Sequence, residues 1–258
     1  MTHQADRFSL AGRTTLIIGG SGGLGRAIAL GYAGAGARVL VAGRDQSKLD
    51  RISRELGAEG AKPPVAYAAD VRAPSAIADL AAQVEADHAP VDVLVNCQGT
   101  TIIKPAIEVT EAEYDLILDT NLKSVYFACT EFGRRMCERR AGVIINISSL
   151  AARSGWAKAA PYCATKWAVT GLTETFAAEW GAFGVRVNAI APGFFLTDLN
   201  RDRMSEDRKA EARRRNAMQR MGEPQELIGA AIYLASPAAQ FVSGATLRVD
   251  GGYLASGI

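Results

Sequence analysis

The sequence predicts an α/β fold: one doubly wound domain over residues 1–258, with a seven-stranded, mostly parallel sheet and helices on both faces. Short β-branched segments alternate with longer segments that carry apolar residues at i, i+3 and i+4 spacing, the pattern of βαβ units. Some strand segments, such as 143–147, are almost continuously apolar, as expected of strands covered on both faces. Because no low-complexity linker divides the chain, we favour one domain over two.

The first half of the chain supplies four predicted strands. We expect them at residues 14–18, 38–42, 65–69 and 91–95, each rich in β-branched or small apolar residues. Apolar residues at helical spacing lie between them: Ile28, Tyr32 and Ala35 after the first strand, and Ile77, Leu80, Ala81 and Val84 after the third. These helices return the chain to the next parallel strand.

The second half supplies three more strands and two long helices. The strands are expected at residues 142–147, 185–190 and 246–249. One helix follows Glu111, and another starts near Pro161, a residue suited to a first helical position. The alternation therefore continues to the end of the chain.

Composition excludes several classes of protein. The chain has 258 residues, 29 Lys and Arg against 27 Asp and Glu, and a net charge of +2, which argues against a nucleic-acid partner. Its four cysteines form no C-x-x-C pair and it has only two histidines, so we expect no metal. No run of about 18 apolar residues occurs and the first residues are polar, so we expect a cytoplasmic protein with no membrane partner.

A glycine-rich turn follows the first predicted strand. Glycines let the backbone turn tightly there, and the next helix offers free N–H groups and a partial positive charge to a pyrophosphate. The alternative is a tight turn without a ligand. Because strand, turn and helix all match, we predict a dinucleotide site that includes Gly19, Ser21, Gly22, Gly23, Leu24 and Gly25.

The end of the second strand indicates which dinucleotide binds. NAD-binding domains place an acidic residue about 20 residues after the glycine turn, whereas an arginine accommodates a 2'-phosphate. Gly43 occupies the acidic position, Arg44 supplies a guanidinium, and Asp45 falls where it would cap the next helix. We therefore expect NADP(H), with NAD(H) possible because an arginine can also stack on adenine.

Three polar residues in the middle of the chain form a candidate acid/base group. Tyr162 and Lys166 are four residues apart on one helical face, and Ser149 lies just past the carboxyl end of a strand. A nearby ammonium favours a phenolate and so lowers a tyrosine pKa. The other interpretation is an aromatic core residue beside a solvated lysine.

Several motifs in register resemble the short-chain dehydrogenase/reductase family, whose fold is of the Rossmann type. They cover nearly the whole chain and comprise Gly19-x-x-x-Gly23-x-Gly25, Asn96-Cys-Gln-Gly99, Asn121, Ser149, Tyr162-x-x-x-Lys166, Pro192-Gly193 with Thr197, and Val249-Asp-Gly-Gly252. The resemblance implies hydride transfer between a secondary alcohol or ketone and NAD(P)(H).

The resemblance also implies a role for individual residues. Tyr162 would be the acid/base, Ser149 rather than Ser148 would polarise the substrate oxygen, and Lys166 would lower the Tyr162 pKa and bind the nicotinamide ribose. Asn121 would help to hold a water in the proton relay. The remaining cofactor contacts would come from Asp70 and Val71 at the adenine, from Thr197 near the carboxamide, and from Asn96, Gly99, Pro192 and Gly193.

The sequence departs from the family pattern at two places. Ile18 stands where threonine is common, and Cys97-Gln98 replaces Asn-Ala. We expect these departures to adjust the surface on which the cofactor lies and the shape of the pocket, without loss of activity. Gln98 would either contact the substrate or pack beside the nicotinamide.

The substrate is less well defined. Residues 194–220 correspond to a variable lid, and 201–220 hold eight basic residues and four acids, which could attract an anion or be a solvated face with pairs such as Glu211–Arg215. We expect Trp156 and Phe194 at the pocket mouth. The overall pattern, including the segment from Asp250 to Ile258, most resembles sugar-acid dehydrogenases of the gluconate 5-dehydrogenase and 2-deoxygluconate 3-dehydrogenase kind. A 3-oxoacyl-[acyl-carrier-protein] reductase is the alternative, and a cofactor-sensing or scaffold protein is the non-enzyme alternative. Family members suggest a homotetramer.

Overall fold

The sheet has seven strands, all paired in parallel, as predicted. The computed structural model describes residues 7–58, 66–197 and 204–256. The strand order is β3-β2-β1-β4-β5-β6-β7. The strands are β1 (Thr14–Ile18), β2 (Arg38–Gly43), β3 (Ala66–Ala68), β4 (Val93–Asn96), β5 (Gly142–Ile147), β6 (Val185–Pro192) and β7 (Thr246–Val249).

The strand order reverses at β1. This strand pairs with β2 on one side and β4 on the other, so that Ile18 lies opposite both Ala42 and Asn96. Ligands of open parallel sheets bind outside the carboxyl ends of the strands at such a reversal. A ligand site is therefore expected in the crevice where the loops after β1 and β4 leave the sheet.

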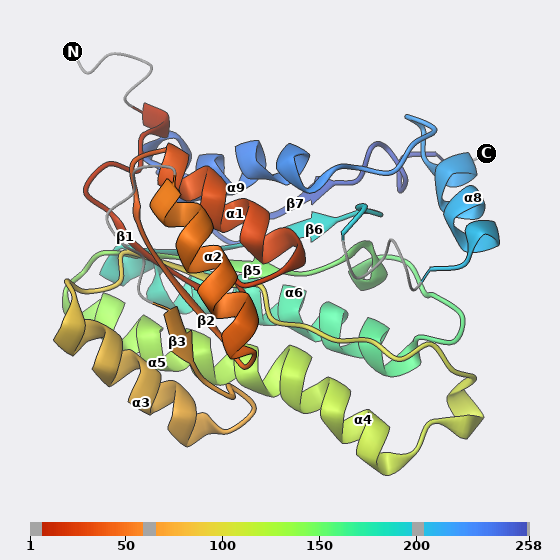
Figure 1. The fold of residues 1–258 in the computed structure, drawn as a ribbon, viewed down its shortest axis with the longest axis horizontal. Coiled ribbons are helices and arrows are strands. Elements are labelled where there is room, and N and C mark those ends of the chain that lie inside the picture. Colours follow the sequence, from red (N-terminus) through yellow and green to blue (C-terminus); the bar gives the residue numbers. More distant parts are fainter. Residues whose placement is uncertain (1–6, 59–65, 198–203, 257–258) are drawn as a thin grey trace.

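One face of the sheet is covered by α1 (Gly23–Gly34), α2 (Gln46–Ala58) and α9 (Ile228–Ala235) (Figure 1). Ile17, Ile28 and Leu234 belong to the core cluster on this face. The buried Tyr32 hydroxyl donates to the Ala231 carbonyl at 3.0 Å, which joins α1 to α9. Apolar burial is thus combined with a satisfied polar group.

The opposite face is covered by α3 (Pro74–Asp87), α5 (Ser124–Glu138) and α6 (Ala160–Trp180), with α4 (Glu111–Leu118) beside them (Figure 1). Leu16, Leu94 and Ile144 point into the core on this side, where Phe132 of α5 packs. The result is a three-layer α/β/α arrangement.

Shorter elements complete the described chain. One further helix, α8 (Glu206–Arg215), lies beyond the end of β6 (Figure 1). The short helical segments are η2 (Ala106–Glu108), η3, a π-helical turn (Asp119–Lys123), η4 (Leu150–Ala152), η5 (Gly181–Phe183), η6 (Pro224–Leu227) and η7 (Pro237–Ala239). No helix among these described residues is both long and apolar enough to cross a membrane.

The observed strand limits differ slightly from the predicted ones. The third strand covers Ala66–Ala68, and Val65 lies outside the described residues. The fourth starts at Val93 instead of Val91, although Val91 is fully buried. Val91 is buried in the core but is not part of the paired strand. A run of apolar residues can therefore be longer than the strand that it contains.

Candidate active site

The loops after β1 and β4 approach each other closely at the strand reversal. Gly19 has a φ of 82°, and a Cβ atom there would lie 2.8 Å from the Gln98 nitrogen and 2.9 Å from the Cys97 carbonyl carbon. A side chain at this position would clash with backbone, and the positive φ would strain it. Glycine is therefore required where β1 leaves the sheet.

The turn from β1 into α1 leaves an open helix N-terminus. A Cβ on Gly25 would lie 2.3 Å from the Gly19 oxygen, whereas one on Gly22, the N-cap, would meet nothing within 4 Å. Gly22 provides no side-chain cap, and the first turn of α1 holds no acid. With no side-chain cap and with space beside Gly22, the α1 N-terminus and its dipole suit a pyrophosphate.

The end of β2 carries the features expected for a 2'-phosphate. A Cβ on Gly43 would lie 3.1 Å from the Ser21 hydroxyl, so the acidic position adjoins the glycine turn. Asp45 accepts from the Ser47 hydroxyl at 2.6 Å and from the Lys48 N–H at 3.2 Å. Its predicted capping role at α2 is confirmed, and the exposed Arg44 is left as the charged group at the strand end.

The proposed acid/base residues converge on the other side of the crevice. Ser149 is buried and Tyr162 is half-buried, and the Ser149 hydroxyl lies close enough to Tyr162 to lower its pKa. Lys166 is 4% exposed; its Nζ donates to the Ile147 carbonyl at 2.8 Å and lies 5.8 Å from the Tyr162 ring centroid. Strand β5 and helix α6 therefore hold the three side chains together.

Burial dominates the electrostatics of this group. It raises the pKa of Tyr162, and the hydrogen bond from Ser149 only partly offsets that rise. It also lowers the pKa of Lys166 to about 8. Removal of the phenol from water is thus the largest influence on the Tyr162 pKa in the free chain, and the lowering of that pKa by Lys166 stays a prediction.

The two serines after β5 have different surroundings. Ser148 shares hydrogen bonds with the Lys166 carbonyl at 3.2 Å and with the Thr170 hydroxyl at 3.1 Å. Ser149 instead caps η4, its oxygen accepting from the Ala151 N–H at 3.1 Å. Ser148 is thus tied to α6, and Ser149 is the serine that adjoins Tyr162.

Asn121 lies in the π-helical turn between α4 and α5, fully buried. Its Oδ1 accepts from the Thr100 N–H at 2.7 Å, and its Nδ2 donates to the Thr100 carbonyl at 2.9 Å. A Cβ on Gly99 would lie 3.7 Å from both Asn121 Oδ1 and Lys166 Nζ. The side chain therefore fixes the loop after β4 beside Lys166, and the π-turn places it there.

Comparison with known proteins shows which proteins the chain is similar to. A family model described as Enoyl-(Acyl carrier protein) reductase matches residues 19–254. The chain is 37% identical to gluconate 5-dehydrogenase of Gluconobacter oxydans, over 99% of this chain and 100% of that protein. It is 39% identical to galactitol 2-dehydrogenase (L-tagatose-forming) of Cereibacter sphaeroides, over 95% and 96%.

A solved structure agrees with these matches. The gluconate 5-dehydrogenase of Burkholderia cenocepacia, in complex with NADP and tartrate, superimposes with a TM-score of 0.92 at 36% identity, over 98% of this chain and 99% of that one. The chain belongs to the short-chain dehydrogenase/reductase family. This confirms the predicted fold and enzyme class, an oxidoreductase acting on CH–OH groups with NAD(P).

The end of β4 and the loop after it turn two predicted site residues inward. Asn96 donates to Asn146 Oδ1 at 2.9 Å, and Gln98 donates to the Ser124 hydroxyl at 3.1 Å. Gln98 is 7% exposed, and its Oε1 has no partner among the described residues. Packing is thus favoured over substrate contact for Gln98, and Asn96 could meet the cofactor only through its backbone.

The loop after β6 reaches the glycine turn. Gly193 donates its N–H to the Val249 carbonyl at 2.9 Å, and a Cβ there would lie 2.8 Å from the Asp250 Cα. Thr197 lies over α1, its Cγ2 3.7 Å from where a Gly23 Cβ would be. The family's Pro-Gly and Thr positions are therefore on the same crevice as the glycine turn.

A row of aromatic rings extends from Tyr162. Trp156 stacks between Tyr162, at 6.1 Å between centroids, and Phe194, at 5.2 Å. Phe194 contacts Tyr253 at 5.3 Å, and the Arg215 guanidinium lies 5.2 Å from the Tyr253 centroid. Sequence reasoning placed Trp156 and Phe194 at the pocket but missed Tyr253, whose only signal was an aromatic residue after the closing Asp-Gly-Gly.

The predicted lid is described only in part. Residues 198–203 lie outside the described residues. In α8, Glu211 pairs with Arg214 at 2.6 Å and not with Arg215, the partner named for the solvated-face alternative, while Arg215 stacks on Tyr253. No group of three metal-ligating side chains occurs within the described ranges.

Proposed function

We propose that this chain interconverts a secondary alcohol and a ketone on a sugar acid, using NADP(H) in preference to NAD(H). One observation carries the reaction type: Ser149 adjoins Tyr162, and the buried Lys166 lies 5.8 Å from the Tyr162 ring centroid, on the crevice that the glycine turn opens. A polarising hydroxyl and a proton donor meet at one place, as carbonyl reduction requires.

In the proposed reduction, the Tyr162 phenol gives its proton to the carbonyl oxygen while Ser149 donates a hydrogen bond to the same oxygen. In the oxidation, Tyr162 takes that proton back. The raised Tyr162 pKa keeps the phenol protonated and ready to donate. The Lys166 ammonium, held by the Ile147 carbonyl at 2.8 Å, stabilises the phenolate that follows.

The residues of the crevice fit a nicotinamide dinucleotide. When bound, it supplies or accepts the hydride. The α1 N-terminus would hold its pyrophosphate, Asp70 and Val71 would hold the adenine, and Lys166 the nicotinamide ribose. The NADP preference is supported by Gly43 in place of an acid, by the exposed Arg44, and by Asp45, which is engaged in capping α2.

The sugar-acid assignment is supported by the relatives named for gluconate. The relative named for galactitol makes a neutral polyol the main alternative substrate class. We propose that the chain is one domain over residues 1–258 with residues 194–220 as its lid, where α8 brings a surplus of arginine close to the aromatic row. A carboxylate would be attracted to that surplus, and a neutral polyol would not.

A cofactor and substrate panel on the purified protein tests the proposal. Absorbance would follow NADPH and NADH with a keto-gluconate, a neutral ketose and an acetoacetyl thioester. We expect NADPH with the keto-gluconate to give the highest kcat/KM. A higher value for the ketose or the thioester would overturn the sugar-acid assignment, and no reaction with any carbonyl despite NADPH binding would overturn the reaction type.

We also propose a homotetramer. Tyr114 of α4, Tyr126 of α5 and Trp167 of α6 are each at least 41% exposed. A hollow of about 460 Å³ lies between α4 and α6. Exposed aromatic side chains on neighbouring helices are typical of a surface that another protein covers, and a second copy of this chain is the partner that the family suggests.

A further inference from the structure

An ion pair between Asp70 and Arg72 follows closely after β3. The Arg72 Nε lies 2.9 and 3.0 Å from the two Asp70 carboxylate oxygens, and Arg72 Nη2 also contacts Oδ2. The Arg72 backbone N–H donates to Oδ1 at 3.2 Å. This fork-to-carboxylate geometry fixes the Asp70 side chain in one orientation.

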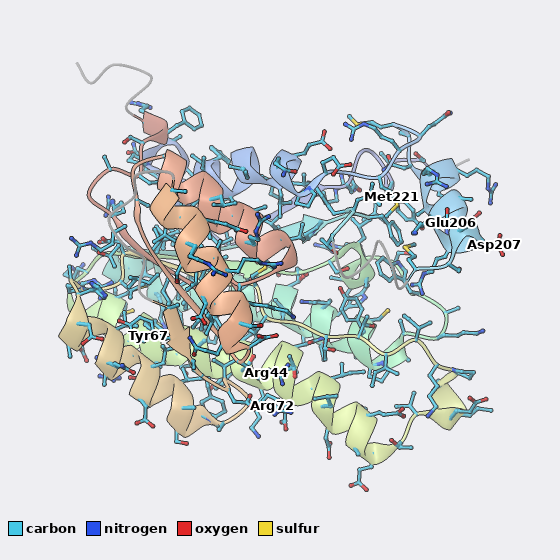
Figure 2. All side chains as sticks on the ribbon, viewed as in Figure 1. Arg44, Tyr67, Arg72, Glu206, Asp207 and Met221 are labelled. Atoms are coloured by element: carbon cyan, nitrogen blue, oxygen red, sulfur yellow. The ribbon has the colours of Figure 1, made fainter. Side chains whose placement is uncertain are left out.

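The pair lies next to the group expected to meet the 2'-phosphate. Strands β2 and β3 are neighbours, and the Ala69 N–H donates to the Gly43 carbonyl at 2.8 Å. Arg44 follows Gly43, and Figure 2 shows Arg44 and Arg72 on the same side of the molecule, where these strands end. Arg72 chiefly, and Arg44 to a lesser extent, lower the pKa of Asp70 to about 2.

This arrangement leaves Asp70 as a pure hydrogen-bond acceptor. Its side chain is 41% exposed although Arg72 occupies one edge of the carboxylate, so lone pairs remain open to a ligand. The exocyclic amine of adenine is a donor that such an oxygen accepts. Hypoxanthine carries a carbonyl oxygen at that position, which Asp70 would repel.

We propose that Arg72 is a positioning residue that holds the Asp70 carboxylate in the orientation that accepts from the adenine amine, so that the dinucleotide site selects an aminopurine. This rests on the proposed function, since it assumes that the crevice binds NADP(H). Without Arg72, the free Asp70 carboxylate would turn toward Arg44, the other cation that lowers its pKa, and would be drawn away from the base.

Binding of NADPH and of its hypoxanthine analogue, deamino-NADPH, tests this without relying on turnover. Isothermal titration would give Kd for both nucleotides with wild type, Arg72→Gln, Arg72→Lys, Asp70→Asn and the double variant. We expect wild type to prefer NADPH by about tenfold, the worth of a hydrogen bond to a charged group. Arg72→Gln should bring that ratio close to one, and Arg72→Lys should restore part of it.

The double variant separates positioning from a direct contact. If Arg72 acts through Asp70, Arg72→Gln changes the ratio by less than about twofold when Asp70 is already Asn. An unchanged ratio in Arg72→Gln, or an equal change in both backgrounds, would overturn the inference while leaving NADPH binding intact. Failure of the wild type to bind either nucleotide would instead overturn the proposed function on which it rests.

Discussion

Gly43 is the residue on which the proposed preference for NADP(H) most directly depends, because it leaves the acidic position without a side chain. We expect Gly43→Asp to weaken NADPH binding by about tenfold or more and to strengthen NADH binding, because a carboxylate would repel the 2'-phosphate and accept from a 2'-hydroxyl. Fluorescence titration with both nucleotides measures the change.

Gly43→Ala is the matched control, since it adds the same Cβ, 3.1 Å from the Ser21 hydroxyl, without the charge. We expect this variant to keep the wild-type order of affinities. An equal loss of NADPH binding in the Ala and Asp variants would show that crowding of Ser21, and not charge, sets the preference.

Burial of the Lys166 ammonium lowers the free energy of unfolding at neutral pH. Its folded pKa of about 8 lies below the value of about 10.4 in an unfolded chain, so the unfolded state binds more protons between these two values. Wild-type stability therefore rises with pH across that window. At pH 7 Lys166 is protonated in both the folded and the unfolded chain. Only the folded chain removes this ammonium from water, so its burial reduces stability.

We expect Lys166→Met to raise the free energy of unfolding at pH 7 by about 2 kcal/mol, after subtracting the lost hydrogen bond to Ile147, and to abolish turnover. Urea unfolding at pH 7 and pH 10 measures this gain, which should shrink at the higher pH. A variant less stable than wild type at pH 7 would contradict the burial argument.

At the scale of elements, the turn from β1 into α1 can be tested by two alanine substitutions. Gly25→Ala should abolish NADPH binding, because its Cβ would lie 2.3 Å from the Gly19 oxygen and the turn would open. Gly22→Ala should keep the thermal stability of the wild type, since a Cβ there meets nothing within 4 Å. Thermal unfolding with and without NADPH distinguishes the two; a Gly25→Ala protein that NADPH stabilises normally would refute this account of the turn.

Elements with a local signature could be predicted from the sequence. The glycine turn, the capping role of Asp45 and the α6 face that carries Tyr162 and Lys166 depend on neighbours a few residues away. The π-turn around Asn121 could not be predicted, because its sequence fits an uninterrupted helix and only the fit of α4 and α5 to the Thr100 loop reveals it.

At the scale of the whole molecule, the site depends on segments that only the sheet brings together. Phe194 follows β6 and Tyr253 follows β7, and pairing of these strands sets the two rings side by side. The sequence could not predict that contact or the Arg215 stacking. For the same reason it could not predict the Tyr162 pKa, which depends on how completely the chain around the phenol excludes water.

The proposed homotetramer is also a property of the whole molecule. We expect Trp167→Glu to dissociate the homotetramer, because it would place a charge in the apolar surface formed by α4, α5 and α6. Light scattering at micromolar concentration measures the mass. Met218→Glu, at another exposed apolar side chain, should leave the mass unchanged. A wild type that is already monomeric would contradict the proposed assembly.

The role of Tyr162 is the central claim, and Tyr162→Phe tests it most directly because this change removes one oxygen and keeps the ring that stacks on Trp156. NADPH binding and keto-gluconate reduction would be measured on the same preparation. We expect kcat to fall by about 10³-fold while the Kd for NADPH stays within about twofold of wild type. Full turnover with normal NADPH binding would contradict the account.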